Sequence, residues 1–557
     1  MGAVSAGSPG FPGAGWASPY AGVAPYRPDL LAGSAPPAQI TPPSPRFPAQ
    51  ASPGMAANGF SNPWAMNAWR YRPLTQAAPV STTTTHSLPW ENRLKQMFMR
   101  NEAVVYALLI RTFAASDANH DGVIQPSESG TFRKAIERLD EFKALGVNTL
   151  HVMPIQPASR ERRMGEAGNP YAPSDLLAIN PEYLDPNSPL TPAQQARQFV
   201  DAAHQRGLHV ILDVPMFASY DLARKHPELI ARNSRNEPIQ PSQWRDMLLF
   251  ENNKALVDYY DRFFETTSRD LNVDGYRLDV ARSRPPWFWE FFTRKYPEKL
   301  WLAESYGIQD ASPLKNIAPD DPELLLKAGF DATYGEFHQF PEMRDANIFM
   351  DYLTSRHGMI RRTGAGKSFL GSYYTPYDFS LMTRGGVPMA LLSVGLMALQ
   401  PWTNPYFVDG LMTGFERPFD LFNYRPRPQG SHPEIGRYAR QMLDLRRRYL
   451  PLISEGLFIP LDVNRADAPQ IISFARHHQG KTLLIVANRD VNARHSAVIS
   501  APGLRANQQL ADLAPSYGQS SKFIVDTNNL SVDLAPGRFH VFEIDAPAIA
   551  LHARSYR

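Results

Sequence analysis

The chain contains no cysteine. It therefore forms no disulfide bond, and it has no thiolate to bind zinc, hold an iron–sulfur cluster or attack a substrate. Any chemistry that the protein performs falls to carboxylates, imidazoles, hydroxyls and basic side chains.

The chain also has almost no net charge. It carries 57 Lys and Arg residues against 54 Asp and Glu residues, a formal net charge of +3 over 557 residues. Residues 1–90 account for that excess, because they hold four arginines and a single acid, Asp29. The remaining chain is formally neutral, so the isoelectric point of about 8.8 gives no basis for a nucleic-acid partner or an acidic membrane surface.

Long apolar runs are missing as well. The longest, Val387–Leu399, is well short of the roughly 20 residues that cross a bilayer, and it predicts a buried helix instead. The first ten residues have neither the basic leader nor the apolar segment of a signal peptide. We therefore expect no membrane partner and slightly favour the cytoplasm, while the sequence identifies no protein partner.

Residues 1–90 differ in composition from everything that follows. They contain 16 of the 51 prolines and nine of the 35 glycines, and they have few charges. Such a segment buries too little apolar surface to offset the entropy lost on ordering it. We expect a disordered tail over residues 1–90.

Beyond residue 90, short apolar or β-branched runs alternate with amphipathic segments of helical period. This alternation is typical of a (β/α)8 barrel, whose strands are all buried, and we expect the barrel over residues 91–449. The predicted strands are Val104–Phe113, Asn148–Ile155, His209–Val214, Gly275–Val280, Leu300–Ser305, Ala332–Gly335, Lys367–Tyr373 and Asn404–Val408. The predicted helices are Thr131–Leu145, Thr191–Arg206, Asn252–Thr267, Pro286–Lys295, Ala346–His357, Pro388–Leu399 and Pro433–Arg448.

From about residue 450 the pattern changes to strands without intervening helices. Turn residues such as Gly, Asn, Asp and Pro separate the runs, which predicts a C-terminal antiparallel β-domain over residues 450–557. The predicted strands are Gln470–Ala475, Lys481–Ala487, Ala497–Ser500, Lys522–Val525 and Arg538–Glu543.

Three consecutive barrel strands end in acids, namely Asp213, Asp279 and Glu304. Each acid alone is explained as an ordinary strand-end charge, but in this kind of barrel the active groups lie at the C-terminal ends of the strands. Arg277 and Asp279 are two residues apart on one strand, so they share a face, and the arginine can keep the aspartate ionised as a nucleophile. Glu304 ends an apolar run that would desolvate it and suit it to act as a general acid. Retaining glycoside hydrolysis needs such a pair of carboxylates.

Several of these segments resemble the α-amylase family, family 13 of the glycoside hydrolases. They are Val104-Val105-Tyr106, Leu145–Asn148 with Pro154-Ile155, Asn169-Pro170-Tyr171 with Asp175, Ile211–Val214, Asp274–Asp279 and Leu302–Glu304, within a resemblance over about residues 100–545. The resemblance implies a retaining enzyme acting on α-glucans or maltooligosaccharides, with Asp279 as nucleophile, Glu304 as acid/base and Arg277 orienting the nucleophile. It also implies that Tyr171 and Asp213 shape the sugar subsite at the point of cleavage.

The chain departs from the family pattern in two places. The family's first motif usually continues from its aspartate to an Asn-His pair, whereas here Asp213 is followed by Val-Pro-Met-Phe-Ala. The fourth motif usually closes in Asn-His-Asp and supplies a third carboxylate, whereas the matching run here ends in Ser372, Tyr373 and Tyr374. Losing one preorganised polar contact to a transition state typically costs on the order of 10²–10³ in rate.

Three interpretations follow from these departures. In the first, the chain is a divergent glycosidase or transglycosylase in which Asp378 or Tyr374 takes over part of the role of the missing acid. In the second, it binds α-glucan without cleaving it, and in the third it is a calcium-dependent scaffold whose proline-rich tail recruits partners. The retention of Arg277, Asp279 and Glu304 in matching contexts favours the enzyme.

Residues 117–128 have the pattern of a calcium loop, with oxygen-bearing side chains at alternating positions and a glycine at the sharp turn. The family also often carries a short calcium site at this place, so we expect a structural Ca²⁺ ion. The alternative is a turn rich in Asp and Asn that leads into a helix capped by Ser127 or Thr131. The predicted ligands are Asp117, Asn119, Asp121, the backbone carbonyl of Val123, and Glu128.

Two further residues lie near the predicted site. His151 ends the second strand and could line the sugar site, but a lone strand histidine is more often a core residue with satisfied hydrogen bonds. Asp246 follows the third strand in a loop where the family contacts substrate, which makes it a candidate contact.

Overall fold

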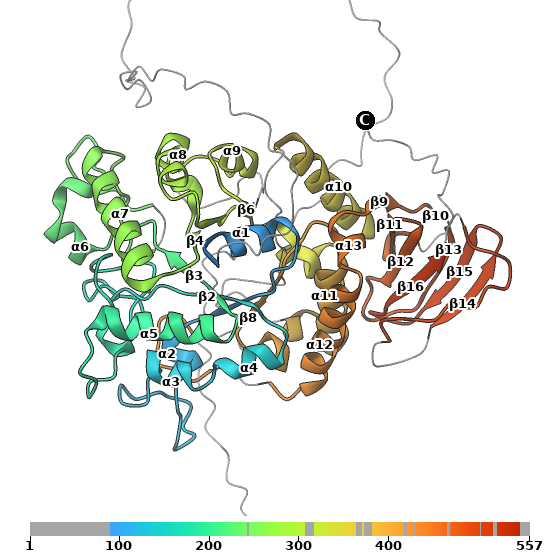
Figure 1. Cartoon of the computed structure of the whole chain (residues 1–557), viewed down its shortest axis with the longest axis horizontal. Helices are drawn as coiled ribbons and strands as arrows, with labels where there is room; N and C mark the ends of the chain where they lie inside the picture. Colours follow the sequence, from blue (N-terminus) through green and yellow to red (C-terminus); the bar gives the residue numbers. More distant parts are fainter. Residues whose placement is uncertain are drawn as a thin grey trace, which may run out of the picture. The chain divides into compact units, whose positions relative to one another are not determined.

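The computed structural model describes residues 90–241, 244–306, 317–363, 370–371, 381–416, 420–427, 430–464, 468–501, 503–515 and 521–545 (Figure 1). The tail predicted to be disordered, residues 1–90, lies outside this part of the chain except for Trp90. Helix α1 (Trp90–Met99) begins there and was not predicted from the sequence.

Eight parallel strands form the sheet of the barrel, in the order β6-β5-β4-β3-β2-β1-β8-β7 (Figure 1). Every neighbouring pair in this order runs parallel, as the alternating pattern predicted. The structural neighbours reported below are barrels of the same kind, so the predicted (β/α)8 fold is confirmed. The strands are β1 (Val105–Leu108), β2 (Thr149–Val152), β3 (His209–Val214), β4 (Gly275–Leu278), β5 (Leu300–Ala303), β6 (Ala332–Thr333), β7 (Leu370–Gly371) and β8 (Pro405–Val408).

The first predicted strand was too long. It was expected over Val104–Phe113, but β1 ends at Leu108 and the short helix α2 (Ile110–Phe113) follows directly. All four residues of α2 are buried, so the strand and the helix together read as one continuous apolar run. Hydrophobic periodicity alone cannot separate the two structures in a run of this kind.

Helices alternate with the strands and cover the outside of the sheet. Their starts follow local capping chemistry: Thr191 and Gln194 form a reciprocal capping box at α5, with Pro192 in its first turn. The predicted helix Thr131–Leu145 is divided into two pieces, α3 and α4. The helices are α3 (Phe132–Ile136), α4 (Leu139–Ala144), α5 (Pro192–Gln205), α6 (Tyr220–Lys225), α7 (Lys254–Thr266), α8 (Pro286–Lys295), α9 (Pro322–Lys327), α10 (Ala346–Thr363), α11 (Leu381–Leu399), α12 (Pro433–Arg448) and α13 (Leu450–Ser454).

Helix α11 contains the longest apolar run and is the one described helix that is long and apolar enough to cross a membrane. Gly385 and Gly386 interrupt it with non-helical backbone, so its regular part begins at Val387. Residues 389–399 are all buried, and α11 packs against α12 and strand β16 of the C-terminal domain. This helix therefore serves as a core element, as the sequence predicted.

The C-terminal domain consists of two four-stranded antiparallel sheets, in the orders β16-β12-β11-β9 and β10-β13-β15-β14. Leu484 and Val486 of β12 face a core shared with the second sheet, whereas Leu483 and Ile485 face the core that continues into the barrel. Burial on both faces explains the unbroken apolar run of β12. The strands are β9 (Leu457–Pro460), β10 (Val463–Asn464), β11 (Ile471–His478), β12 (Lys481–Asn488), β13 (His495–Ser500), β14 (Lys522–Asp526), β15 (Asn529–Leu534) and β16 (Phe539–Asp545).

Candidate active site

The three strand-end acids meet around one buried arginine. Arg277 Nη1 lies 2.8 Å from Asp213 Oδ1 and 2.9 Å from Asp279 Oδ1, and its Nη2 lies 3.1 Å from Glu304 Oε1. The arginine side chain is only 2% exposed. A single guanidinium therefore gathers carboxylates from three neighbouring strands at one end of the barrel.

The strand register produces this meeting. Asp213 on β3 pairs directly with Arg277 on β4, and Arg277 pairs with Leu302 on β5. Side chains two residues apart on a strand share a face, so Asp279 and Glu304 lie one step further along, on the same inner face. The structure thus brings the three strand-end acids together around Arg277.

Glu304 accepts hydrogen bonds at both of its oxygens. The backbone N–H of Val280 donates to Oε2 over 2.7 Å, and the Tyr306 hydroxyl donates to Oε1 over 2.9 Å. Arg277 approaches Oε1 as well. These contacts fix the carboxyl beside Asp279.

Val280 adopts a left-handed backbone conformation, with φ 38° and ψ 57°. This conformation is uncommon for a β-branched residue and costs about 1–3 kcal/mol, and such strain gathers at functional sites. Here it turns the chain directly after Asp279 and directs the Val280 N–H toward Glu304.

Asp213 is completely buried. The Tyr171 hydroxyl donates to its Oδ2 over 2.8 Å, His151 Nε2 lies 3.0 Å from the same oxygen, and Arg277 binds Oδ1. The acid therefore anchors Tyr171 and Arg277 from beneath the site. The resemblance implied that Asp213 and Tyr171 shape the sugar subsite; the structure joins the two by a hydrogen bond and gives Asp213 no exposed surface with which to touch a sugar.

His151 belongs to a hydrogen-bonded network inside the barrel. Its Nδ1 lies 2.6 Å from the Tyr406 hydroxyl, which lies 3.2 Å from the Tyr334 hydroxyl. Tyr334 in turn accepts a hydrogen bond from Arg277 Nε over 3.1 Å. The expectation that His151 is a core residue agrees with its burial and with the hydrogen bond at Nδ1, but Nε2 makes only the ion-pair contact with Asp213, and this link to the acids was missed.

Sequence reasoning also missed Tyr306, Tyr334 and Tyr406. Tyr334 follows β6 directly and Tyr406 lies within β8, where an aromatic residue is expected merely from packing. Tyr306 lies two residues beyond Glu304. That spacing on a strand end is the one signal that could have identified it.

The pKa values of Asp279 and Asp213 are shifted in opposite directions. Burial and the nearby Glu304 raise the pKa of Asp279 well above its ordinary value, although Arg277 opposes this. Burial also acts to raise the pKa of Asp213, but Arg277 and His151 outweigh it and hold that pKa low. Three carboxylates share the one guanidinium, so Arg277 offsets only part of the effect of burial and of Glu304 on Asp279.

Tyr374 and Asp378, the proposed substitutes for the third acid, lie outside the described residues. The structure accordingly leaves their part of the prediction untested.

The loop predicted to bind calcium is tied by its own hydrogen bonds. Asp117 Oδ2 accepts from the Gly122 N–H over 3.1 Å, Asp121 Oδ1 accepts from the Val123 N–H over 2.8 Å, and Glu128 accepts from a backbone N–H within the loop. Asn119 donates to the other Asp121 oxygen over 2.9 Å. Asp117 Oδ1 is buried and accepts no hydrogen bond from the described residues, which suits a cation ligand. In the described ranges, however, no three His, Cys, Asp or Glu side chains are close enough to hold a metal ion.

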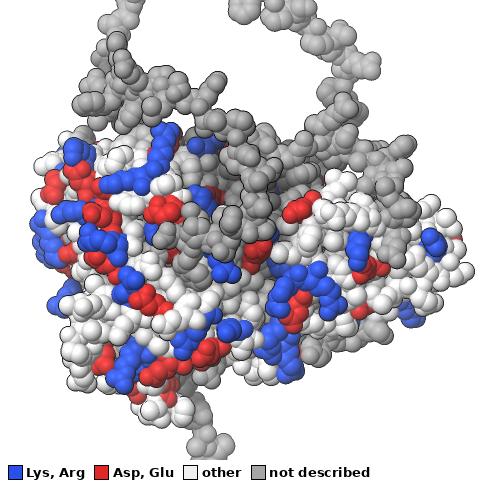
Figure 2. Space-filling model, in the orientation of Figure 1, with Lys and Arg blue, Asp and Glu red and all other residues white. Residues whose placement is uncertain are grey.

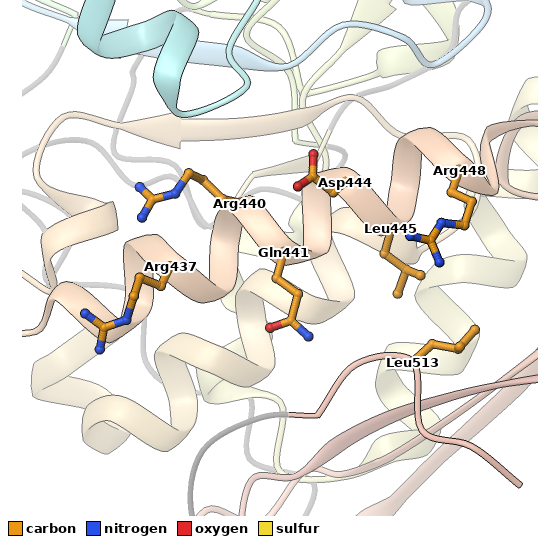
Figure 3. A pocket seen from close by; sticks show the side chains of 7 residues that line it. All are labelled: Arg437, Arg440, Gln441, Asp444, Leu445, Arg448 and Leu513. Carbon is orange, nitrogen blue, oxygen red and sulfur yellow. The ribbon is translucent and has the colours of Figure 1, made fainter.

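A hollow of about 560 Å³ lies away from these acids, between α12 and the loop that carries Leu513 (Figure 3). Its size falls in the range of ligand sites, but its lining contains arginines and a single acid, Asp444, which pairs with Arg447. It therefore lacks the carboxylate pair that glycoside chemistry needs. Figure 2 shows Lys and Arg gathered where Figure 1 draws α12, and both signs intermixed over the rest of the described face.

Asp246, the candidate contact in the loop after β3, is fully buried. Burial raises its pKa to about 6, although Asn169 opposes this. The Asn169 amide approaches Asp246 Oδ1 at 3.5 Å, and Asn169 accepts a hydrogen bond from the Tyr171 N–H over 3.0 Å. Asp246 thus supports the segment that carries Tyr171 and does not itself reach the surface.

Replacing Asp246 by asparagine should change how stability depends on pH. The folded pKa of about 6 lies above the ordinary value of 3.8, so ionisation of Asp246 removes stability as the pH rises from about 4 through 6. A pKa difference of about two units between the folded and unfolded states lowers the free energy of unfolding by about 3 kcal/mol at most. We expect Asp246→Asn to raise the free energy of unfolding at pH 7 and to leave it nearly unchanged at pH 4, as measured by urea denaturation.

The matched control is Asp258→Asn, at an exposed position on α7 that pairs only with Lys254 within the same helix. It should not alter the pH dependence. Parallel stability curves for wild type and Asp246→Asn between pH 4 and 7 would show that Asp246 is not buried as a raised-pKa acid.

The chain is similar in sequence to several enzymes that act on α-glucans. No family model matches the chain. An α-1,4-glucan:maltose-1-phosphate maltosyltransferase of Rhodospirillum rubrum is 25% identical over 449 residues, covering 72% of this chain and 59% of that protein. A cyclomaltodextrinase of Thermoanaerobacter pseudethanolicus is 23% identical over 430 residues, covering 70% of each protein. The chain thus spans less than two thirds of the length of the first relative.

Solved structures show the same fold. A maltogenic α-amylase of Thermotoga neapolitana aligns with a TM-score of 0.65 at 20% identity, covering 81% of this chain and 100% of the other. An α-amylase of Lactobacillus plantarum aligns with a TM-score of 0.61 at 21% identity, covering 80% and 100%. The chain thus has the fold of these α-amylases, is similar in sequence to the two enzymes above, and gathers three carboxylates around Arg277 at one end of its barrel.

Proposed function

We propose that the protein is an α-glucan-active glycosidase or transglycosylase that works with retention by double displacement. The observation that carries the proposal is the pair Asp279 and Glu304, both bound to adjacent amino groups of Arg277. Two carboxyl groups held this close, from neighbouring strands at one barrel end, suit a nucleophile and an acid/base.

In the first step, the Asp279 carboxylate attacks the anomeric carbon of the sugar while Glu304 gives its proton to the leaving glycosidic oxygen. In the second step, Glu304 takes a proton from water or from an acceptor hydroxyl, and that oxygen displaces Asp279 from the anomeric carbon. The pair must hold one proton at the start of each cycle. A buried cluster of three acids around one cation favours retaining one proton, and the first step needs that proton on Glu304 and not on Asp279, whose own pKa is raised.

The substrate class follows from the relatives. The proteins that resemble this chain are named for α-1,4-glucan maltosyl transfer, cyclomaltodextrin breakdown and α-amylase activity. We infer that maltooligosaccharides or α-glucans are the substrates here as well. Tyr171, held over the carboxylates by Asp213, would pack against the sugar ring, and Asp378 or Tyr374 would replace part of the family's third acid.

Replacing Asp279 by asparagine should abolish turnover. The change removes the nucleophile but keeps the shape of the side chain, so the protein should remain folded. We expect wild type to release product from maltooligosaccharides and Asp279→Asn to lose at least about 10³-fold in kcat/KM. ¹H NMR of the first product should show the α-anomer, as retention requires.

Asp258→Asn again serves as the control and should keep full activity. A product of inverted configuration would exclude double displacement. If wild type binds α-glucan without any turnover, the catalytically silent alternative is correct, and if it neither binds nor turns over, both sugar functions are wrong.

The pH dependence of kcat/KM should reflect the shared cation. The first step needs an ionised Asp279, and its pKa is raised, so activity should fall with decreasing pH already above the ordinary range of aspartate near 4. A profile of kcat/KM between pH 4 and 9 measures this acidic limb, the range in which activity falls as the pH decreases. An acidic limb at or below pH 4 would contradict the electrostatic account of the pair.

We also propose a structural Ca²⁺ ion in the loop of residues 117–128. The unpartnered Asp117 Oδ1 supports it, while Asn119 would have to release Asp121 for both to bind the ion. Adding CaCl₂ should raise Tm with the logarithm of its concentration, because the ion binds only the folded loop. MgCl₂ should have less effect, and Asp117→Asn should remove the calcium response. Calorimetry without binding heat, together with an unchanged Tm, would disprove the site.

A further inference from the structure

Five side chains form a closed ring of polar contacts inside the barrel, next to the carboxylate pair; four of the links are hydrogen bonds or bonded ion pairs, and the fifth, from His151 to Asp213, is an ion-pair contact without hydrogen-bond geometry. The ring draws on five barrel strands or their ends: β2, β3, β4, β6 and β8. Its links measure 3.1 Å from Arg277 to Tyr334, 3.2 Å from Tyr334 to Tyr406, 2.6 Å from Tyr406 to His151, 3.0 Å from His151 to Asp213, and 2.8 Å from Asp213 back to Arg277. All five residues are buried.

Donor and acceptor chemistry gives the ring a direction. Arginine only donates and a carboxylate only accepts, so the chain of hydrogen bonds starts at Arg277 and ends at Asp213. Each hydroxyl between them accepts from one neighbour and donates to the next. In this order His151 accepts from Tyr406 at Nδ1 and turns Nε2–H toward Asp213 Oδ2, 3.0 Å away, which is the neutral Nε2–H tautomer. A protonated His151 would donate at both nitrogens and reverse the link to Tyr406.

The environment of His151 agrees with the neutral form. The groups that face it are Asp213 from β3 and Tyr406 from β8, with Arg277 from β4 and Glu304 from β5 acting over a longer range. Burial lowers the pKa of His151, and this effect outweighs the attraction of Asp213.

The ring restrains the arginine that holds the catalytic pair. Arg277 Nε is bound to Tyr334, and its Nη1 is bound to Asp213. Because the guanidinium is a rigid planar group, fixing two of its nitrogens also sets the direction of the third. That third nitrogen, Nη2, is the one that contacts Glu304.

We propose that His151 and Tyr406 are positioning residues for catalysis, which orient Arg277 toward both carboxylates through this closed ring. The role of the ring in turnover rests on the function proposed above. The tautomer of His151 does not depend on that function, so the two can be tested separately.

The test combines Tyr406→Phe with ¹⁵N NMR of the full-length protein labelled at histidine. The substitution removes one hydroxyl and leaves the ring of the side chain in place. In wild type, the His151 signals, assigned by their absence in His151→Gln, should show Nε2 protonated and Nδ1 unprotonated between pH 5.5 and 8. In Tyr406→Phe we expect kcat on maltooligosaccharides to fall by about 10- to 100-fold with little change in KM, and the acidic limb of the pH profile to move.

Tyr276→Phe is the matched control. Tyr276 precedes Arg277 on β4, is equally buried, and bonds to the hydroxyls of Thr267 and Ser268 on the outer face of the strand. It should lower Tm to a similar extent without changing kcat or the pH profile. Should Tyr406→Phe fail to fold, Tyr334→Phe breaks the neighbouring link and is read in the same way.

Two outcomes overturn the proposal. One is a charged or Nδ1–H His151 in wild type, whether or not the protein turns over α-glucan. The other is an equal loss of kcat in Tyr406→Phe and Tyr276→Phe, which would reduce the ring to a packing role. If wild type shows no turnover while His151 is neutral and Nε2-protonated, the proposed function fails and the ring itself stands.

Discussion

The site depends on one buried guanidinium that three carboxylates share. Arg277 binds Asp213, Asp279 and Glu304 at 2.8–3.1 Å, and each contact replaces water that the buried groups have lost. Removing one partner from a buried ion pair typically costs about 3–5 kcal/mol, since it leaves an unbalanced charge in the interior. With one cation among three anions, however, the balance is incomplete, and the raised pKa of Asp279 is the consequence. The pairing of Asp279 with Glu304 and the raised pKa of Asp279 therefore have the same origin.

Much of the fold was predictable from sequence because burial on both faces makes a parallel strand readable as a short apolar run. Strand β3 was predicted to the residue, and helices α8 and α12 likewise. Predictions failed where two structures share one pattern, as at the junction of β1 and α2, and where elements are short, as in β9, β10 and helix α9. Such elements are set by tertiary contacts, which leave little periodicity to read.

The residues of the candidate site also fall into two groups, those that the sequence identified and those that it did not. The acids were found because strand period places Asp279 beside Arg277, and strand ends converge in a barrel. The tyrosines were not found, since an aromatic residue on a strand gives the same signal whether its hydroxyl bonds or only its ring packs. The raised pKa of Asp279 was not foreseen, for a related reason. Sequence shows that an arginine is near an aspartate, but it does not show how many other acids share that arginine.

The residues missing from the family motifs bear on different steps from those that the ring supports. The pair Asp279 and Glu304 is assembled by β3, β4 and β5, whereas the altered fourth motif follows β7 in the sequence. The hydrogen bonds and ion pairs described for Asp279 and Glu304 come from β3, β4, β5 and the residues that follow them. Replacing a buried ion cluster of this kind by apolar residues often leaves the stability of a protein unchanged or raises it by about 1–4 kcal/mol. A protein that only bound α-glucan would gain nothing from this loss of stability. Double displacement, by contrast, requires both carboxylates in one place. The physical balance therefore favours a slow or altered enzyme over a silent binding protein.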